Sequence, residues 1–157
     1  MSETEVAAYD VVPAEIARRV RIIRIPLIPG GYAGMTLVRT VLLARDVEPD
    51  GSSPLLAHEL VHVRQWTEEG ILRFSSSYLG SFLRNLARLR RWNAAYHQID
   101  HELEAKQETT DWLRRRSRAN AESEARAAAA AAESDRRQGP DGPPPADAEP
   151  DPGPSAA

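Results

Sequence analysis

Two histidines and a glutamate stand together as His58-Glu59-Leu60-Val61-His62, the pattern His-Glu-x-x-His. On a helix, side chains four residues apart project from one face, so the imidazoles of His58 and His62 can bind the same metal ion. Glu59, directly after the first histidine, is placed to act as a general base on a water molecule at that ion. The spacing therefore predicts a zinc site that hydrolyses its substrate.

The segment around this pattern is typical of a helix that buries one side. At about 100° per residue, three apolar residues fall roughly opposite the two histidines: Leu56, Leu60 and Val63. Ser53 is a suitable N-cap, Pro54 a suitable first residue, and Gly70 a suitable end. We expect a helix over 54–69 that presents its histidines to a cleft.

A catalytic zinc ion needs a third protein ligand and keeps its fourth position for water. The chain has no cysteine, which excludes thiolate ligands and disulfide bonds and leaves downstream histidines and carboxylates. On an ideal helix, an apolar stripe centred near Leu103 lies about 65° from Glu102, about 135° from Glu104, and more than about 150° from His97 and His101. We favour Glu102 as the third ligand, with Glu104 or a histidine as alternatives.

Two features complicate this ranking. His97 and His101 are themselves four residues apart, so a second metal site between them stays open. Trp112 falls opposite the stripe of Ile99, Leu103, Thr110 and Leu113, which would be explained if the helix were covered on a second side.

The segments HELVHVRQW and ELEAK, about forty residues apart and preceded by TLVRTVLLAR, resemble the small gluzincin-type zinc metallopeptidases, in particular short bacterial proteins of unknown function. The resemblance covers roughly residues 22–107 and implies a minimal zincin-like domain. Glu102, with Ala105 three residues on, matches the start of the clan's Glu-x-x-Ala-Asp element. Lys106 stands where many members have an aspartate that supports a ligand histidine, and Asp100 or Asp111 would have to substitute for it.

The expected reaction is peptide-bond hydrolysis, in which zinc activates water and Glu59 takes its proton. The strand expected over 37–44 resembles the clan's edge strand, where a peptide substrate pairs. Tyr78, Tyr96 and His97 are candidates for stabilising the oxyanion. The alternative function is a metal-binding adaptor domain with the same fold and little or no hydrolytic activity.

The organisation predicted along the chain is α+β, with a short N-terminal sheet followed by helices. We expect a short helix over 13–19, strands over 20–25 and 37–44 with a turn at 29–31, and helices over 54–69, 70–91 and 99–132. The zincin-like domain would span 1–118. Residues 119–157 would form an alanine-rich helical extension and a disordered tail rich in proline and acid.

The expected partner is a peptide or protein substrate, as the resemblance implies, and the charge distribution weighs against nucleic acid. Residues 1–118 carry 17 basic and 15 acidic residues, too balanced for a nucleic-acid-binding domain, and 119–157 carry 3 and 8. No apolar run reaches the ~18 residues of a membrane span, and no signal peptide is seen, so we expect a cytoplasmic protein. The charges in 70–91 are all arginine, which leaves peripheral membrane contact open, although packing against the metal-binding helix is favoured.

Overall fold

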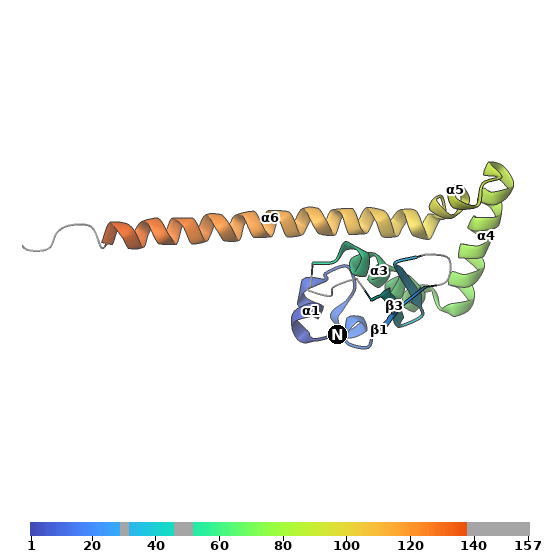
Figure 1. The fold of residues 1–157 in the computed structure, drawn as a ribbon, viewed down its shortest axis with the longest axis horizontal. Coiled ribbons are helices and arrows are strands. Elements are labelled where there is room, and N and C mark those ends of the chain that lie inside the picture. The colour runs from blue at the N-terminus through green and yellow to red at the C-terminus, as the bar shows by residue number, and fades with distance from the viewer. Residues whose placement is uncertain (29–31, 46–51, 138–157) are drawn as a thin grey trace, which may run out of the picture. The chain divides into compact units, whose positions relative to one another are not determined.

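The computed structural model describes residues 1–28, 32–45 and 52–137. Figure 1 shows the elements in order: α1 (Glu3–Ala8), α2 (Ala14–Ala17), β1 (Arg21–Ile25), β2 (Gly34–Leu37), β3 (Thr40–Ala44), α3 (Pro54–Glu69), α4 (Ile71–Leu89), α5 (Trp92–His97) and α6 (Asp100–Arg137). The chain divides into two units, residues 1–118 and 119–157. The predicted α+β class is confirmed for the described residues, whereas the expected tail after residue 137 lies outside them.

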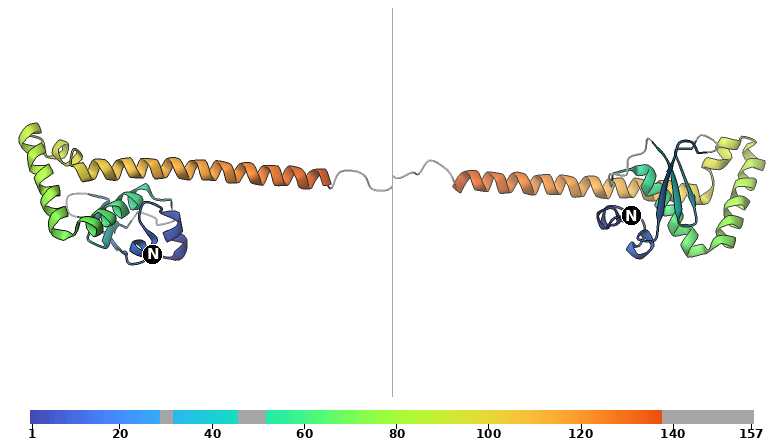
Figure 2. Two further views of the ribbon diagram at one scale, coloured as in Figure 1. Left: turned by 180° about the vertical axis from the view of Figure 1, so that it is seen from behind. Right: turned by 60° about the horizontal axis from the view of Figure 1, so that its bottom comes forward.

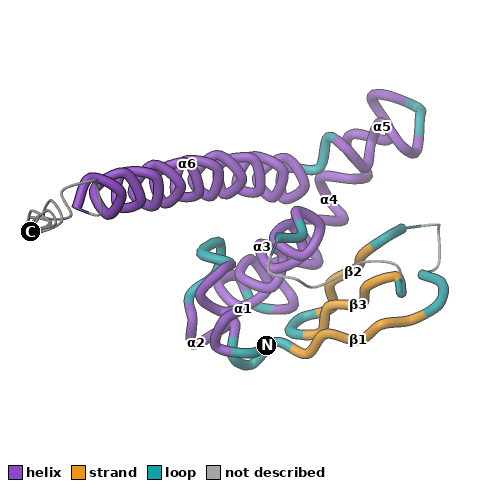
Figure 3. The backbone as a smooth tube through the Cα atoms, turned by 60° about the vertical axis from the view of Figure 1, so that its left-hand side comes forward, coloured by secondary structure: helices purple, strands orange, loops and turns teal. Residues whose placement is uncertain are grey.

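The three strands form one small sheet in the order β1-β3-β2, in which β3 pairs parallel with β1 and antiparallel with β2 (Figure 3). The prediction of a single strand over 37–44 is wrong, because a turn at Val38 and Arg39 divides that segment between β2 and β3. Val38 adopts a φ of 57°, a conformation that a β-branched residue rarely takes, so no sequence signal marks the turn. β3 is consequently the central strand, and the edge nearest the helices of the site belongs to β2. The turn expected at 29–31 lies outside the described residues.

Helix α3 has the boundaries that its capping residues predict. The Ser53 hydroxyl accepts a hydrogen bond from the Leu56 amide at 3.2 Å, Pro54 is the first residue, and Gly70 ends the helix with a φ of 78°. The residues predicted to face inward are fully buried, together with two side chains of β3: Leu56, Leu60, Val63, Val41 and Leu43. Figure 2 shows the strands side by side with α3 beside them, so the sheet fixes one side of this helix.

Helix α6 buries a different face from the predicted one. Its buried residues are His101, Glu102, Ala105, Thr109 and Trp112, preceded by the buried Ile99, whereas Leu103 and Leu113 are exposed. Trp112 stacks on Tyr9 with ring centroids 5.3 Å apart, and its Nε1 donates to the Ala8 carbonyl at 3.0 Å. The N-terminal segment therefore covers α6 on the side of Trp112, and the helix continues to Arg137 rather than ending near residue 132.

The remaining helices differ in detail from the sequence expectations. Helix α2 is shorter than 13–19, with Pro13 as its N-cap rather than its first residue. The segment 70–91 becomes α4, which ends at Arg90 in the left-handed conformation (φ 53°), and α5 follows without having been predicted. Phe74 of α4 packs on Trp66 of α3 with centroids 4.2 Å apart, as expected. Among the described residues, no helix is both long enough and apolar enough to span a bilayer.

Candidate metal centre

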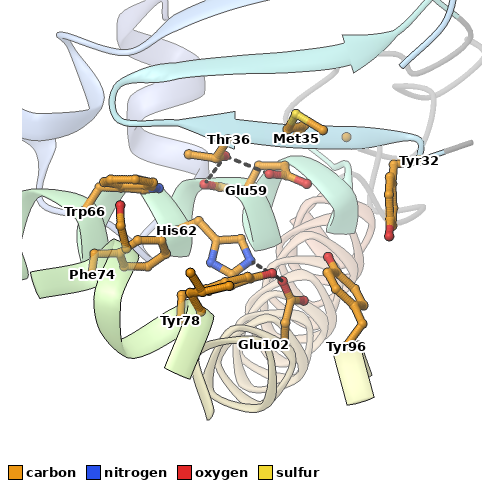
Figure 4. Close-up of a pocket in the computed structure, with 13 residues that line it drawn as sticks. Tyr32, Met35, Thr36, Glu59, His62, Trp66, Phe74, Tyr78, Tyr96 and Glu102 are labelled. Carbon is orange, nitrogen blue, oxygen red and sulfur yellow. Dashed lines mark hydrogen bonds and ion pairs between the residues drawn. The ribbon is translucent and has the colours of Figure 1, made fainter. Parts of the chain in front are cut away.

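Two helices bring three candidate ligands together. His58 and His62 project from α3 with their Nε2 atoms 3.2 Å apart, and Glu102 approaches from α6. The Glu102 carboxylate places Oε2 at 3.3 Å from His58 Nε2 and Oε1 at 3.4 Å from His62 Nε2. Figure 4 shows His62 and Glu102 facing each other across the site, with Glu59 on the neighbouring turn of α3. The predicted ligand set is therefore assembled in space.

The donor set and its spacing fit a zinc ion. Ligand bonds of about 2.0 to 2.1 Å at a tetrahedral angle separate the ligand atoms by about 3.3 Å. The two Nε2 atoms are 3.2 Å apart, and they lie 3.3 and 3.4 Å from different oxygens of the Glu102 carboxylate. With one ligand atom taken from each residue, the three atoms lie within 4.8 Å of one another. Two imidazoles and one carboxylate are also donors that zinc accepts in catalytic sites, where a fourth position stays open. The residues can thus hold zinc.

The burial of the Glu102 carboxylate favours a cation beside it. Glu102 is 3% exposed, and a buried carboxylate is stable only when it is paired with charge or hydrogen-bond donors. Burial by itself would raise its pKa, but hydrogen bonds from His58, His62 and the Tyr78 hydroxyl (2.8 Å) hold the pKa of Glu102 well below its usual range. Burial opposes charge on His62 as well, yet Glu102 raises the pKa of that imidazole. A proton or a metal cation is therefore favoured between these groups.

The alternative ligands lie elsewhere. Glu104 is exposed and accepts a hydrogen bond from Arg64 at 3.0 Å rather than facing the histidines. His97 is exposed, with its Nδ1 3.2 Å from Lys106 Nζ. His101 is buried, but its Nε2 lies 2.8 Å from a Glu69 oxygen. His97 and His101 therefore have separate partners, and a second metal site between them is not present in the described part of the chain.

Gln65 supports His62 from the next turn of α3. Its Nε2 donates to the His101 carbonyl (3.2 Å) and to Glu104 Oε2 (2.9 Å), which turns its amide oxygen toward His62 Nδ1 at 2.8 Å. Since this oxygen can only accept, the proton of His62 belongs on Nδ1 and Nε2 keeps its lone pair for a metal. Glu104, which is not a ligand, therefore acts by holding Gln65.

Gln65, and not Lys106, contacts the ring nitrogen of His62 that faces away from Glu102, whereas Lys106 lies beside His97. Asp100 and Asp111, which the sequence offered in place of an aspartate at position 106, interact with other residues and not with the histidines. Asp100 accepts a hydrogen bond from the Ser81 hydroxyl at 3.0 Å, and Asp111 accepts one from Gln107 at 3.0 Å. Gln65 was detectable in the sequence, because a residue three positions after His62 shares its helix face.

Glu59 lies buried between α3 and the edge strand β2. Thr36 Oγ1 is 2.7 Å from its Oε2 and 3.0 Å from its backbone carbonyl, contacts that fix the carboxylate against the strand (Figure 4). Gly34 leaves the necessary room, since a Cβ there would stand 2.6 Å from Glu59 Oε1. Burial raises the pKa of Glu59, while the Thr36 hydrogen bond and the two histidines oppose that rise.

A cavity of about 430 Å³ opens beside Glu59, His62 and Glu102. Its other walls come from β2, α3, α4 and the segments beside them: Tyr32, Gly34, Met35, Thr36, Trp66, Phe74, Ser75, Tyr78, Leu79 and Tyr96. Tyr78 and Tyr96 are therefore at the site, whereas His97 is not among the lining residues. Burial, and then the charge of Glu102, raise the pKa of both tyrosines, so their hydroxyls stay protonated and able to donate.

Comparison with known proteins returns no match: no family model fits the chain, and neither a curated protein nor a solved structure matches it. The resemblance to gluzincin-type peptidases is carried only by the segments HELVHVRQW and ELEAK. The function is therefore inferred from the site itself.

Proposed function

We propose that this chain is a zinc-dependent peptidase in which His58, His62 and Glu102 hold the ion and Glu59 is the general base. One observation carries the proposal: the three ligand groups stand 3.2 to 3.4 Å apart beside a buried carboxylate that does not belong to the ligand set. A structural zinc site is usually closed by a fourth protein ligand, whereas three ligands, two of which (His62 and Glu102) line a cavity, leave a position for water.

Zinc, when bound, polarises an amide carbonyl and lowers the pKa of water toward about 7. Glu59 takes the proton from the attacking water and delivers it to the leaving amine. Its raised pKa makes it a stronger base than an exposed glutamate, although it must be ionised to act. Thr36 and Gly34 set its position, and Gln65 sets the tautomer of His62.

The substrate side of the site is formed by β2 and the cavity. Within the described residues, β2 pairs only with β3, so its other edge can accept an extended peptide through backbone hydrogen bonds. This assigns to β2 the role expected of the 37–44 segment. Tyr78 and Tyr96, whose hydroxyls both interact with Glu102 and both line the cavity, are the candidate donors to the developing oxyanion.

A metal-binding adaptor without turnover is the second candidate. It is favoured by the support behind His62, which is the neutral amide of Gln65 rather than a carboxylate. A neutral partner increases the basicity of a ligand histidine less than a charged one does.

The two candidates are separated by measuring zinc content and cleavage of an unfolded protein by the full chain. We expect one zinc per chain in the wild type, and in Glu59→Gln the same zinc content with hydrolysis reduced by at least ~10²-fold. Glu102→Ala should lose most of the zinc, while the matched variant Glu104→Ala keeps its stoichiometry. Zinc without turnover in the wild type would establish the adaptor, and a chain without zinc would refute both.

A further inference from the structure

Helix α4 turns most of its leucines toward solvent instead of burying them. Leu72 is 87% exposed, Leu79 55% and Leu83 53%. The side of the helix that is buried consists of Phe74, Ser81 and Asn85. At 100° per residue, the centre of this exposed leucine stripe lies about 160° around the helix from the centre of the buried side. The expectation that α4 serves only to close the core therefore holds for Phe74 and fails for the leucines.

The charged residues of α4 and of the two positions after it are all positive. Five arginines on α4 and directly after it are exposed: Arg73, Arg84, Arg88, Arg90 and Arg91. The sequence has no acidic residue between Glu69 and Asp100. Arg84 lies 3.4 Å from Asp100, but both side chains are largely exposed, and such a pair contributes little. The segment consequently presents a net positive charge to any partner.

An exposed aromatic side chain lies shortly after α4, at the first residue of α5. Trp92 is 65% exposed, and the centroid of its ring lies 4.7 Å from the centroid of the Phe82 ring. Tryptophan is enriched at the level of lipid headgroups, where its ring meets both apolar and polar surroundings. An exposed leucine stripe, arginines and a terminal tryptophan are the features of a helix that lies in a membrane interface.

We propose that α4 docks this chain on an anionic lipid surface. The stripe of Leu72, Leu79 and Leu83 enters the boundary between headgroups and acyl chains, and the arginines are attracted to the lipid phosphates. Charge selects this partner over a second copy of the chain, because two copies of α4 would bring two arginine-rich segments together. A bilayer that contains anionic lipid supplies the opposite charge.

The docking surface continues into the cavity of the candidate metal centre. Leu79 belongs to the leucine stripe and also lines the cavity, as does Ser75. Docking would therefore hold the cavity next to the bilayer, which, if the proposed peptidase function is correct, favours peptides at the membrane surface as substrates. Lipid binding itself requires neither zinc nor hydrolysis.

Co-sedimentation of the full chain with vesicles tests the docking. We expect binding to mixed phosphatidylglycerol and phosphatidylcholine vesicles that weakens with added salt, and little binding to phosphatidylcholine alone. The double variant Leu72→Gln and Leu83→Gln, which spares the cavity, should bind at least about tenfold more weakly. The matched double variant Leu27→Gln and Leu113→Gln replaces two exposed leucines elsewhere and should bind as the wild type does.

Trp92 gives a second measurement that needs no leucine variant. Its fluorescence should shift to shorter wavelength and resist acrylamide on anionic vesicles. Trp92→Phe should remove most of that response, since Trp112 is buried and Trp66 is partly buried against Phe74. Glu59→Gln should bind vesicles as the wild type does, which separates docking from catalysis.

Four results would overturn the proposal. The first is no binding to anionic vesicles, and the second is equal loss of binding in both leucine double variants. The third is a wild-type dimer that Leu72→Gln and Leu83→Gln convert to a monomer without any lipid binding, which would assign the stripe to a second copy. Binding of unfolded polypeptide through the stripe, in place of vesicles, would likewise refute it.

Discussion

Replacing Gly34 by alanine should disable the general base while leaving the metal site intact. A Cβ at this position would lie 2.6 Å from Glu59 Oε1, whereas ordinary contact begins at 3.4 Å, so the carboxylate must move by the difference of 0.8 Å. The nearest atom is the end of a flexible side chain, and the backbone of β2 need not shift. The movement takes Glu59 away from its hydrogen bond with Thr36, which is 2.7 Å long.

A displacement of about 1 Å at a catalytic group costs about 10²-fold in rate. We therefore expect Gly34→Ala to lower kcat by about 10²-fold on an unfolded protein substrate, with zinc content and melting temperature close to wild type. Gly80→Ala is the matched control, since nothing lies within 4 Å of a Cβ at Gly80. Full activity in Gly34→Ala would falsify the role given to the position of Glu59, and loss of zinc would show that Gly34 supports the ligands instead.

The remaining predictions concern the hydrogen bond between Gln65 and His62 and the packing of α6 against the N-terminal segment. Gln65→Ala should weaken zinc affinity by about 10 to 100-fold, because His62 loses the partner that fixes its tautomer, whereas Lys106→Ala should leave affinity unchanged in a competition titration with a chelator. Equal effects of the two variants would contradict the assignment. Trp112→Ala should lower the free energy of unfolding by about 3 to 5 kcal/mol in a denaturant titration, because it removes the stack on Tyr9 from the core. A loss below 1 kcal/mol, on the order of a surface substitution, would show that the N-terminal segment is not part of the core.

Helix α3 was predictable from the sequence because its determinants are local. Ser53, Pro54 and Gly70 mark its ends, and its apolar spacing separates the buried side from the histidines. The hairpin of β2 and β3 was not predictable in this way, since Val38 and Arg39 carry no turn signal. Because this turn was not predicted, Gly34 and Thr36, the two residues that position Glu59, could not be assigned to the site from the sequence.

Glu102 lies with His58 and His62 as the sequence predicted, but the buried side of its helix is not the predicted one. Counting apolar residues put the centre at Leu103, which is exposed. The buried side is set by Trp112, whose partners are Ala8 and Tyr9. Contacts across such a distance in sequence leave no periodic pattern, so only the spatial arrangement reveals them.

The contact between Trp112 and the N-terminal segment also bears on the order of folding. The hydrogen bond from Trp112 Nε1 to the Ala8 carbonyl spans 104 positions, and contacts between such distant segments require a large loop to close. Because Glu102 lies on the same buried side of α6, its approach to His58 and His62 should coincide with that late closure. A chain still being synthesised would then carry both histidines without the third ligand. Zinc capture during refolding should accordingly appear with the slowest gain of tertiary structure, long after α3 has formed.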